Sequence, residues 1–174
     1  MPAKYNAVTR IVHWLTALLV ITAFVLGPED LDEMSDPSMD LGVQVHESLG
    51  LLIFGLVLFR IIWVFSTEIA IDIAMPRWMK ISAKAIQGAL YFLMLAVPAS
   101  AASGIWLLGK SLSLLNNTMI ASPLGLSERT GEFLLEAHTV GADALLWLAG
   151  IHAVAALFHH YVLKDSVLKS MLPK

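Results

Sequence analysis

The chain has 174 residues, of which 57% are hydrophobic and 14% are charged, and its formal net charge is −3. A soluble domain carries about 25% charged residues, so this composition indicates a protein that folds in a membrane. The absence of cysteine excludes disulfides, thiolate metal sites, iron–sulfur clusters and covalent c-type haem attachment.

The N-terminal half contains two apolar runs separated by an acidic segment. Residues 11–27 are seventeen uncharged residues with His13 near the start, and the polar residues before them lack the apolar core of a signal peptide. We therefore expect this run to be retained as the first span. Residues 28–40 carry six acids and no base, which predicts a solvated loop. A second span is predicted over residues 44–67, with His46 near its start.

The C-terminal half contains two more such runs. A polar connection at residues 68–84 leads to a third predicted span at residues 85–109, which has no charged residue. We interpret residues 110–136 as a longer loop. The fourth predicted span, residues 138–163, holds four of the six histidines: His138, His152, His159 and His160. Since a helix of about 20 apolar residues crosses a bilayer, the sequence predicts an all-α membrane protein, a single-domain bundle of four transmembrane helices over residues 1–174.

The basic residues are distributed unevenly between the two sides of this bundle. With four spans, the N-terminal segment, the end of the second span, the connection at residues 68–84 and the C-terminal tail share one side. That side holds nine of the eleven Lys and Arg residues, and the other side holds only Lys110 and Arg129. Because basic loops stay in the cytoplasm, we expect both termini to be cytoplasmic.

Two histidines of the fourth span share one helix face. At 100° per residue, His138 and His152 lie ~40° apart around the helix and ~21 Å apart along it, with glycine and alanine between them on that face. One metal ion cannot reach both imidazoles, because metal–nitrogen bonds are only about 2 Å long. Two flat cofactors stacked along the bundle would explain the spacing and the small residues, and we expect these cofactors to be haems.

Depth in the bilayer pairs these histidines with the others. His46 and His138 both lie near the outer surface and can ligate one haem from opposite faces. His13 lies at the cytoplasmic side, where both His152 and His159 are available because their directions differ by only ~20°. Depth alone favours His159. We choose His152, because ligation at His138 and His159 would place the irons ~31 Å apart, at the limits of a ~30 Å hydrocarbon core.

Further polar residues lie near the cytoplasmic level. Arg10 and Arg60 are candidates for ion pairs with haem propionates, and snorkelling to the interface explains them equally well. His159 and His160 are either interfacial residues or groups that serve a redox partner at the cytoplasmic surface.

Several motifs of the chain occur together in a known family. They are KYNAVTRIVHW at residues 4–14, His46 in the second span, H-x(13)-H-x(6)-H-H-Y-x-x-K-D from His138 to Asp165, and the closing MLPK. In combination, and over essentially the whole chain, they resemble the prokaryotic cytochrome b561 family.

The resemblance implies a four-helix cytochrome of the bacterial inner membrane that holds two b haems. The haem ligands that it implies are His13, His46, His138 and His152. It also implies electron exchange with ubiquinone, and one branch of the family oxidises superoxide and passes the electron to that quinone. In the matching C-terminal motif, His159 and Lys164 are the expected quinone contacts.

Two features of this chain differ from what that branch would favour. Lys84 and Gln87 stand at the start of the third span, where close relatives can have histidines. The acidic outer loops repel an anion such as superoxide.

An alternative function is a haem-b membrane anchor subunit of a larger dehydrogenase or hydrogenase, which would use the same spans and ligands. A further alternative is a membrane transporter with structural histidines, which would be a colourless protein.

Overall fold

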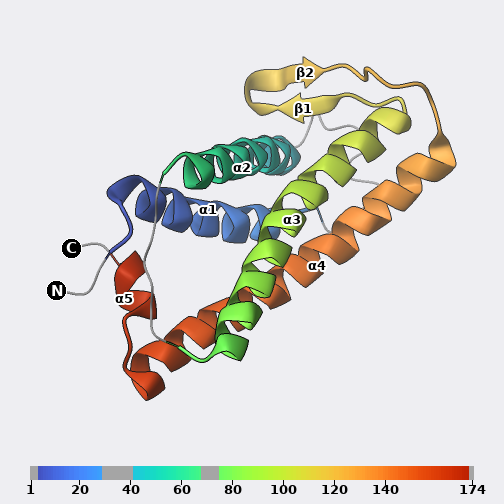
Figure 1. Cartoon of the computed structure of the whole chain (residues 1–174). Coiled ribbons are helices and arrows are strands. Elements are labelled where there is room, and N and C mark those ends of the chain that lie inside the picture. Colours follow the sequence, from blue (N-terminus) through green and yellow to red (C-terminus); the bar gives the residue numbers. More distant parts are fainter. Residues whose placement is uncertain (1–3, 29–40, 68–74, 173–174) are drawn as a thin grey trace.

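The computed structural model of the protein describes residues 4–28, 41–67 and 75–172 (Figure 1). The acidic loop predicted at residues 28–40 lies outside the described residues except for Pro28. In chain order the elements are α1 (Ala7–Val25), α2 (Leu41–Ser66), α3 (Arg77–Leu107), β1 (Leu112–Leu114), the 3₁₀ turn η2 (Leu115–Asn117), β2 (Thr118–Ile120), α4 (Glu128–Phe158), the π-helical turn η3 (His159–Leu163) and α5 (Val167–Met171).

Four helices are long and apolar enough to cross a membrane: α1, α2, α3 and the continuous helix formed by α4 and η3. The predicted all-α bundle of four spans is therefore confirmed. Two predicted connections were wrong in part. α3 begins at Arg77, inside the predicted connection at residues 68–84, and residues 110–136 contain a β-hairpin and the first two turns of α4. Helices extend past the apolar runs because a helix satisfies its own backbone hydrogen bonds in either solvent.

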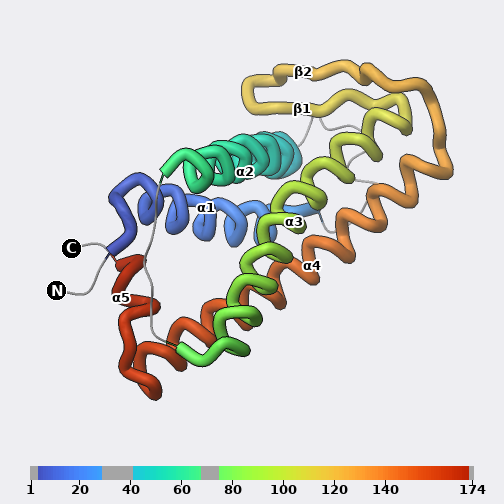
Figure 2. The backbone as a smooth tube through the Cα atoms, in the orientation of Figure 1, coloured from blue at the N-terminus to red at the C-terminus, as the bar shows by residue number. Residues whose placement is uncertain are grey.

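The long helices form two neighbouring pairs, α1 with α2 and α3 with α4, as the ribbon and the backbone tube both show (Figures 1 and 2). α3 and α4 approach most closely at two glycines. A Cβ atom added to Gly104 would lie 3.0 Å from the carbonyl oxygen of Gly131, so a larger residue would force the helices apart. The two pairs meet in one buried apolar cluster to which all four helices contribute, made of Ala23, Ile53, Val57, Met94 and Leu145.

The β1–β2 hairpin is fastened to the first turns of α2. The backbone N–H of Ser113 donates to the carboxylate of Glu47, and the N–H of Leu115 donates to Ser48 Oγ at 3.0 Å. Both bonds connect segments that lie far apart in the sequence. We call this side of the bundle, where α2 and α4 begin, the hairpin end.

The opposite side of the bundle holds both chain termini and is called the termini end. Here the C-terminal segment after η3 lies against the start of α1 (Figure 1). Arg10 Nη1 donates to the carbonyl oxygen of Leu172 at 2.8 Å, and Trp14 Nε1 donates to that of Met171 at 2.9 Å. These side-chain bonds satisfy backbone carbonyls at the end of α5 and hold the tail beside His13.

Candidate functional site

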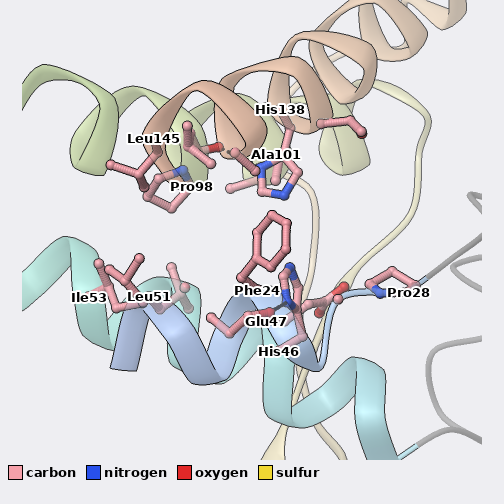
Figure 3. A pocket seen from close by; sticks show the side chains of 18 of the residues that line it. Phe24, Pro28, His46, Glu47, Leu51, Ile53, Pro98, Ala101, His138 and Leu145 are labelled. Carbon is pink, nitrogen blue, oxygen red and sulfur yellow. Dashed lines mark hydrogen bonds between the residues drawn. The ribbon is translucent and has the colours of Figure 1, made fainter. Parts of the chain in front are cut away.

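The hairpin end brings two imidazoles face to face. His46 lies in the second turn of α2 and His138 in the third turn of α4, and both helices run inward from this end. The centroids of the two rings are 6.0 Å apart, and the ring planes make an angle of 85°. Figure 3 shows His138 and His46 projecting from these two helices toward each other.

Both imidazoles line a cavity of about 340 Å³. Its walls are mainly apolar and come from all four long helices, and Phe24, Leu51, Ala101 and Leu145 are among them (Figure 3). Glu47 is the carboxylate beside His46 in this view. A largely apolar cavity with a few convergent polar groups is the usual form of a cofactor site.

Hydrogen bonds define the tautomer of both imidazoles at the hairpin end. His46 Nδ1 lies 2.8 Å from the carbonyl oxygen of Ala23, and His138 Nδ1 lies 2.8 Å from that of Val97. A carbonyl oxygen can only accept, so each Nδ1 carries the proton and each neutral ring keeps its lone pair on Nε2. This is the arrangement in which histidine binds a metal, with the other ring nitrogen donating to a backbone carbonyl.

The termini end brings a second pair of imidazoles together, His13 from α1 and His152 from α4. Their ring centroids are 6.3 Å apart, at an interplanar angle of 69°. The surroundings of this pair differ from those at the hairpin end. Several buried polar atoms here lack a hydrogen-bond partner: Thr9 Oγ1, Arg10 Nε, His13 Nδ1, Arg60 Nε, Trp63 Nε1 and Tyr91 OH.

Two of these atoms belong to guanidinium groups. Arg60 is only 9% exposed, and its guanidinium lies 5.4 Å from the centroid of the Tyr91 ring. Arg10 uses Nη1 to bind Leu172 and leaves Nε unpartnered. Within the described part of the chain neither arginine forms an ion pair with a carboxylate. A buried cation without a counter-charge is unfavourable, so a bound carboxylate would stabilise this region.

The geometry of both imidazole pairs can be tested against a metal-bound cofactor. If one metal ion lies between two imidazoles, each metal–nitrogen bond is about 2 Å long. Adding the distance from each bonded nitrogen to the centre of its ring gives a separation of about 6 Å between the two ring centroids. The observed separations of 6.0 and 6.3 Å agree with this value. Among the described residues, no group of three or more His, Asp or Glu side chains could surround a metal ion.

A metal held by either pair would take its remaining ligands from a cofactor. A porphyrin supplies four nitrogens in a plane and leaves two axial positions for imidazoles. Its apolar ring suits the cavity at the hairpin end, and its carboxylates suit the unpaired arginines at the termini end. The residues present at both ends thus fit haem.

The other predicted site residues lie in the C-terminal turn. His159 does not join the imidazole pair at the termini end, since its Nδ1 is 2.5 Å from the Asp165 carboxylate. Lys164, the other expected quinone contact, has a left-handed backbone with a φ of 55°. The sequence alone indicated no role for Tyr91, Asp165 or Glu47, although an ionisable residue within a span, such as Glu47, is itself a functional signal.

Comparison of the chain with known proteins identifies a family and several relatives. The family model described as prokaryotic cytochrome b561 matches residues 4–174. The chain is similar to cytochrome b562 of Cereibacter sphaeroides, with 30% identity over 97% of this chain and 94% of that protein. It is similar to cytochrome b561 homolog 2 of Escherichia coli K12, with 27% identity over 99% of this chain and 93% of that protein. It is also similar to the probable superoxide oxidase CybB of Yersinia pestis, with 28% identity over 100% of this chain and 98% of that protein.

The family match covers almost the whole chain, and the four apolar helices and imidazole pairs are consistent with it. Members of this family are membrane electron-transfer proteins that bind haem b. The chain belongs to the prokaryotic cytochrome b561 family.

Proposed function

We propose that this protein is a membrane electron carrier with two b haems, which moves electrons from a donor at the hairpin end to ubiquinone at the termini end. The observation that supports this most is the presence of two facing imidazole pairs, 6.0 and 6.3 Å apart, at opposite ends of one bundle. The ligands of the hairpin-end haem are His46 and His138. The ligands of the termini-end haem are His13 and His152.

The side chains at each site hold and adjust the cofactor. When bound, haem supplies one-electron chemistry, with iron alternating between the ferric and ferrous states. Two imidazoles per iron leave no position for oxygen, which favours electron transfer over oxygen binding. At the hairpin end the carbonyls of Ala23 and Val97 orient the ligands. At the termini end Arg10 and Arg60 neutralise the propionates and thereby hold the cofactor in place.

The distribution of basic residues supports an orientation in the membrane. Nine of the eleven Lys and Arg residues belong to the termini end or its connections, which supports the proposal that both termini are in the cytoplasm of a bacterium and the hairpin is outside its inner membrane. The chain has no cysteine, so single-cysteine labelling can test this directly. A cysteine at Asn117 should react with an impermeant reagent from outside, whereas cysteines at Arg77 and Lys169 should react only after the cells are opened.

We assign the electron donor to the hairpin end of the bundle and the electron acceptor to the termini end. His159 and Lys164 lie in the turn that closes α4 at the termini end, and they form the proposed contact with ubiquinone. Superoxide as the donor at the hairpin end is supported by the name of the Yersinia relative, a probable superoxide oxidase. The acidic loops oppose the approach of this anion.

The decisive experiment is spectroscopic. The purified protein should show the visible spectrum of a b-type cytochrome, two haems per chain and reduction by a ubiquinol analogue. A colourless protein would contradict the haem proposal altogether. One haem per chain would contradict the two-site arrangement. A coloured protein that is reduced by dithionite and by no quinol would contradict the quinone step alone.

A further inference from the structure

The cytoplasmic end of α4 departs from regular α-helix. After Phe158 the chain widens into the π-helical turn η3, and the carbonyl oxygen of His159 accepts from the backbone N–H groups of both Lys164 and Asp165. Lys164 then turns the chain back with a φ of 55°, in the left-handed region that few residues other than glycine adopt. Such π turns are rare and occur frequently at functional sites.

This reversal places the carboxylate of Asp165 on the imidazole of His159. The Nδ1–Oδ2 distance is 2.5 Å, and the other carboxylate oxygen accepts from the backbone N–H of Val167 at 2.9 Å. Both oxygens of Asp165 are thus held, one by each partner. The pair is partly shielded from solvent, since the side chains of His159 and Asp165 are 15% and 22% exposed.

Asp165 is ionised in this arrangement. Partial burial acts to raise its pKa, but the hydrogen bonds from His159 and Val167 and the positive charge of Lys169 outweigh that effect and lower the pKa below its usual value. An ionised carboxylate can only accept hydrogen bonds, so His159 Nδ1 must donate. Nε2 is then the nitrogen that can take or release a proton.

Few other charged groups face this pair. The elements packed against η3 are α4 and α5, and α5 brings Lys169 to this turn, while His160 and Lys164 belong to the turn itself. The buried Nδ1 of His160 has no hydrogen-bond partner. Among these groups Asp165 is the anion, so it is the group that determines which nitrogen of His159 is protonated.

We infer that Asp165 is a positioning residue which makes Nε2 of His159 a proton acceptor and donor for ubiquinone. This inference rests on the proposed function and adds the proton path to it. In the proposed direction, reduction of one ubiquinone to ubiquinol takes up two electrons, which the donor at the hairpin end supplies through the bound cofactors, and two protons. His159 Nε2 takes each proton from water at the termini end and passes it to a quinone oxygen, and the same steps run in reverse when a quinol is the reductant in the assay. Asp165 stabilises the imidazolium during each transfer.

A substitution of nearly unchanged shape tests this role. In Asp165→Asn the amide oxygen can still accept from Val167, while the amide NH₂ faces His159 Nδ1 and forces the ring proton onto Nε2. We expect quinol-driven haem reduction to slow about hundredfold, at the lower end of the ~10²–10⁴-fold contribution of a positioned acid–base group. The solvent deuterium isotope effect should increase, because proton transfer becomes limiting. Asp165→Glu should restore most of the rate.

Two measurements separate this role from simple fastening of the tail. Haem content and reduction by dithionite should be unchanged in Asp165→Asn. Ser170→Ala removes a 2.7 Å hydrogen bond to the Val167 carbonyl within α5 and leaves the His159–Asp165 pair intact, so it should retain the normal quinol rate.

Each contrary outcome overturns a different statement. An unchanged rate and isotope effect in Asp165→Asn would overturn the positioning role while the quinone reaction stands. Equal slowing by Ser170→Ala would show that α5 matters only as structure and would also overturn it. A wild-type protein that no quinol reduces would remove the proposed acceptor, and this inference with it.

Discussion

The two imidazole pairs have similar ring separations but are held in place in opposite ways. At the hairpin end His46 and His138 each donate to a backbone carbonyl, and the cavity around them is mainly apolar. At the termini end His13 Nδ1 has no partner, and a cluster of buried polar atoms lies around the pair unsatisfied. Backbone carbonyls orient the imidazoles at the hairpin end, whereas buried polar and charged groups surround the imidazoles at the termini end.

This difference predicts that the termini-end site depends more on the proposed cofactor. Buried donors and acceptors left without partners are unfavourable, so bound carboxylates and a metal would complete the termini-end site. The hairpin-end imidazoles are already oriented by α1 and α3. We therefore expect the two haems to respond differently to substitutions in their surroundings, although each depends equally on its own ligands.

The largest expected effect is the loss of one haem by removal of one ligand. His138→Ala should lose the hairpin-end haem and His152→Ala the termini-end haem, while each keeps the other, because each iron is held between its own two helices. Haem-to-protein ratio and redox titration measure this. His159→Ala is the matched control and should keep both haems. If His159→Ala lost a haem and His152→Ala retained both haems, the partner of His13 would be His159 and not His152.

The next effect concerns charge at the termini end. Arg60→Gln should lower the midpoint potential of that haem by about 60 mV, because removal of a buried cation disfavours the ferrous state, and 59 mV corresponds to a tenfold change for one electron. The hairpin-end potential should stay the same. Arg77→Gln, which removes an exposed cation at the start of α3, should change neither potential. Equal shifts of both haems would mean that Arg60 acts at long range rather than on one site.

A smaller effect is expected where the hairpin is fastened to α2. Glu47→Ala removes the side-chain acceptor of the buried Ser113 N–H, and loss of the partner of a buried donor costs about 1–3 kcal/mol. Amide exchange in β1 and β2 should accelerate, and the hairpin-end haem should be lost first on warming. Ser48→Ala removes a neutral bond to Leu115 and should have a weaker effect of the same kind. If Glu47→Ala lost the termini-end haem first, the β1–β2 hairpin would not be the element that stabilises the hairpin-end site.

The smallest effect tests superoxide as the donor at the hairpin end. Residues 29–36 hold five acids that lie outside the described residues, and their field repels an anion. At 0.15 M salt the Debye length is already about 8 Å, so added salt should raise the rate of haem reduction by superoxide only modestly. Neutralising the five acids should raise it more at low ionic strength.

The sign of this salt effect distinguishes two routes. If Lys110 or Arg129 formed a local attractive path, added salt would slow the reaction, and replacement of either residue by Gln would reduce the rate. The rate of ferrous haem formation under a steady superoxide source measures both cases. No reduction at any ionic strength, in a protein that still reacts with quinol, would remove superoxide as the donor.

The sequence by itself was sufficient for the class of fold, and it predicted a level in the membrane for each histidine. Apolar runs long enough to cross a bilayer specify spans, because the membrane imposes helices on them. The ~100° turn per residue then places His138 and His152 on one face. Both conclusions need only local periodicity, and the four spans are present in the structure.

The tertiary structure decided which groups meet. Helical periodicity defines a face but not the neighbour of that face, so the sequence preferred His152 to His159 as the partner of His13 only on the expected haem spacing. In the structure, the packing of α1 brings the His13 ring beside His152. The hairpin could not be predicted from local sequence, because its buried strand is held by Glu47 from a distant helix. His159 meets Asp165 only because a π turn and a left-handed Lys164 reverse the chain, a backbone geometry that depends on the segment packed against it.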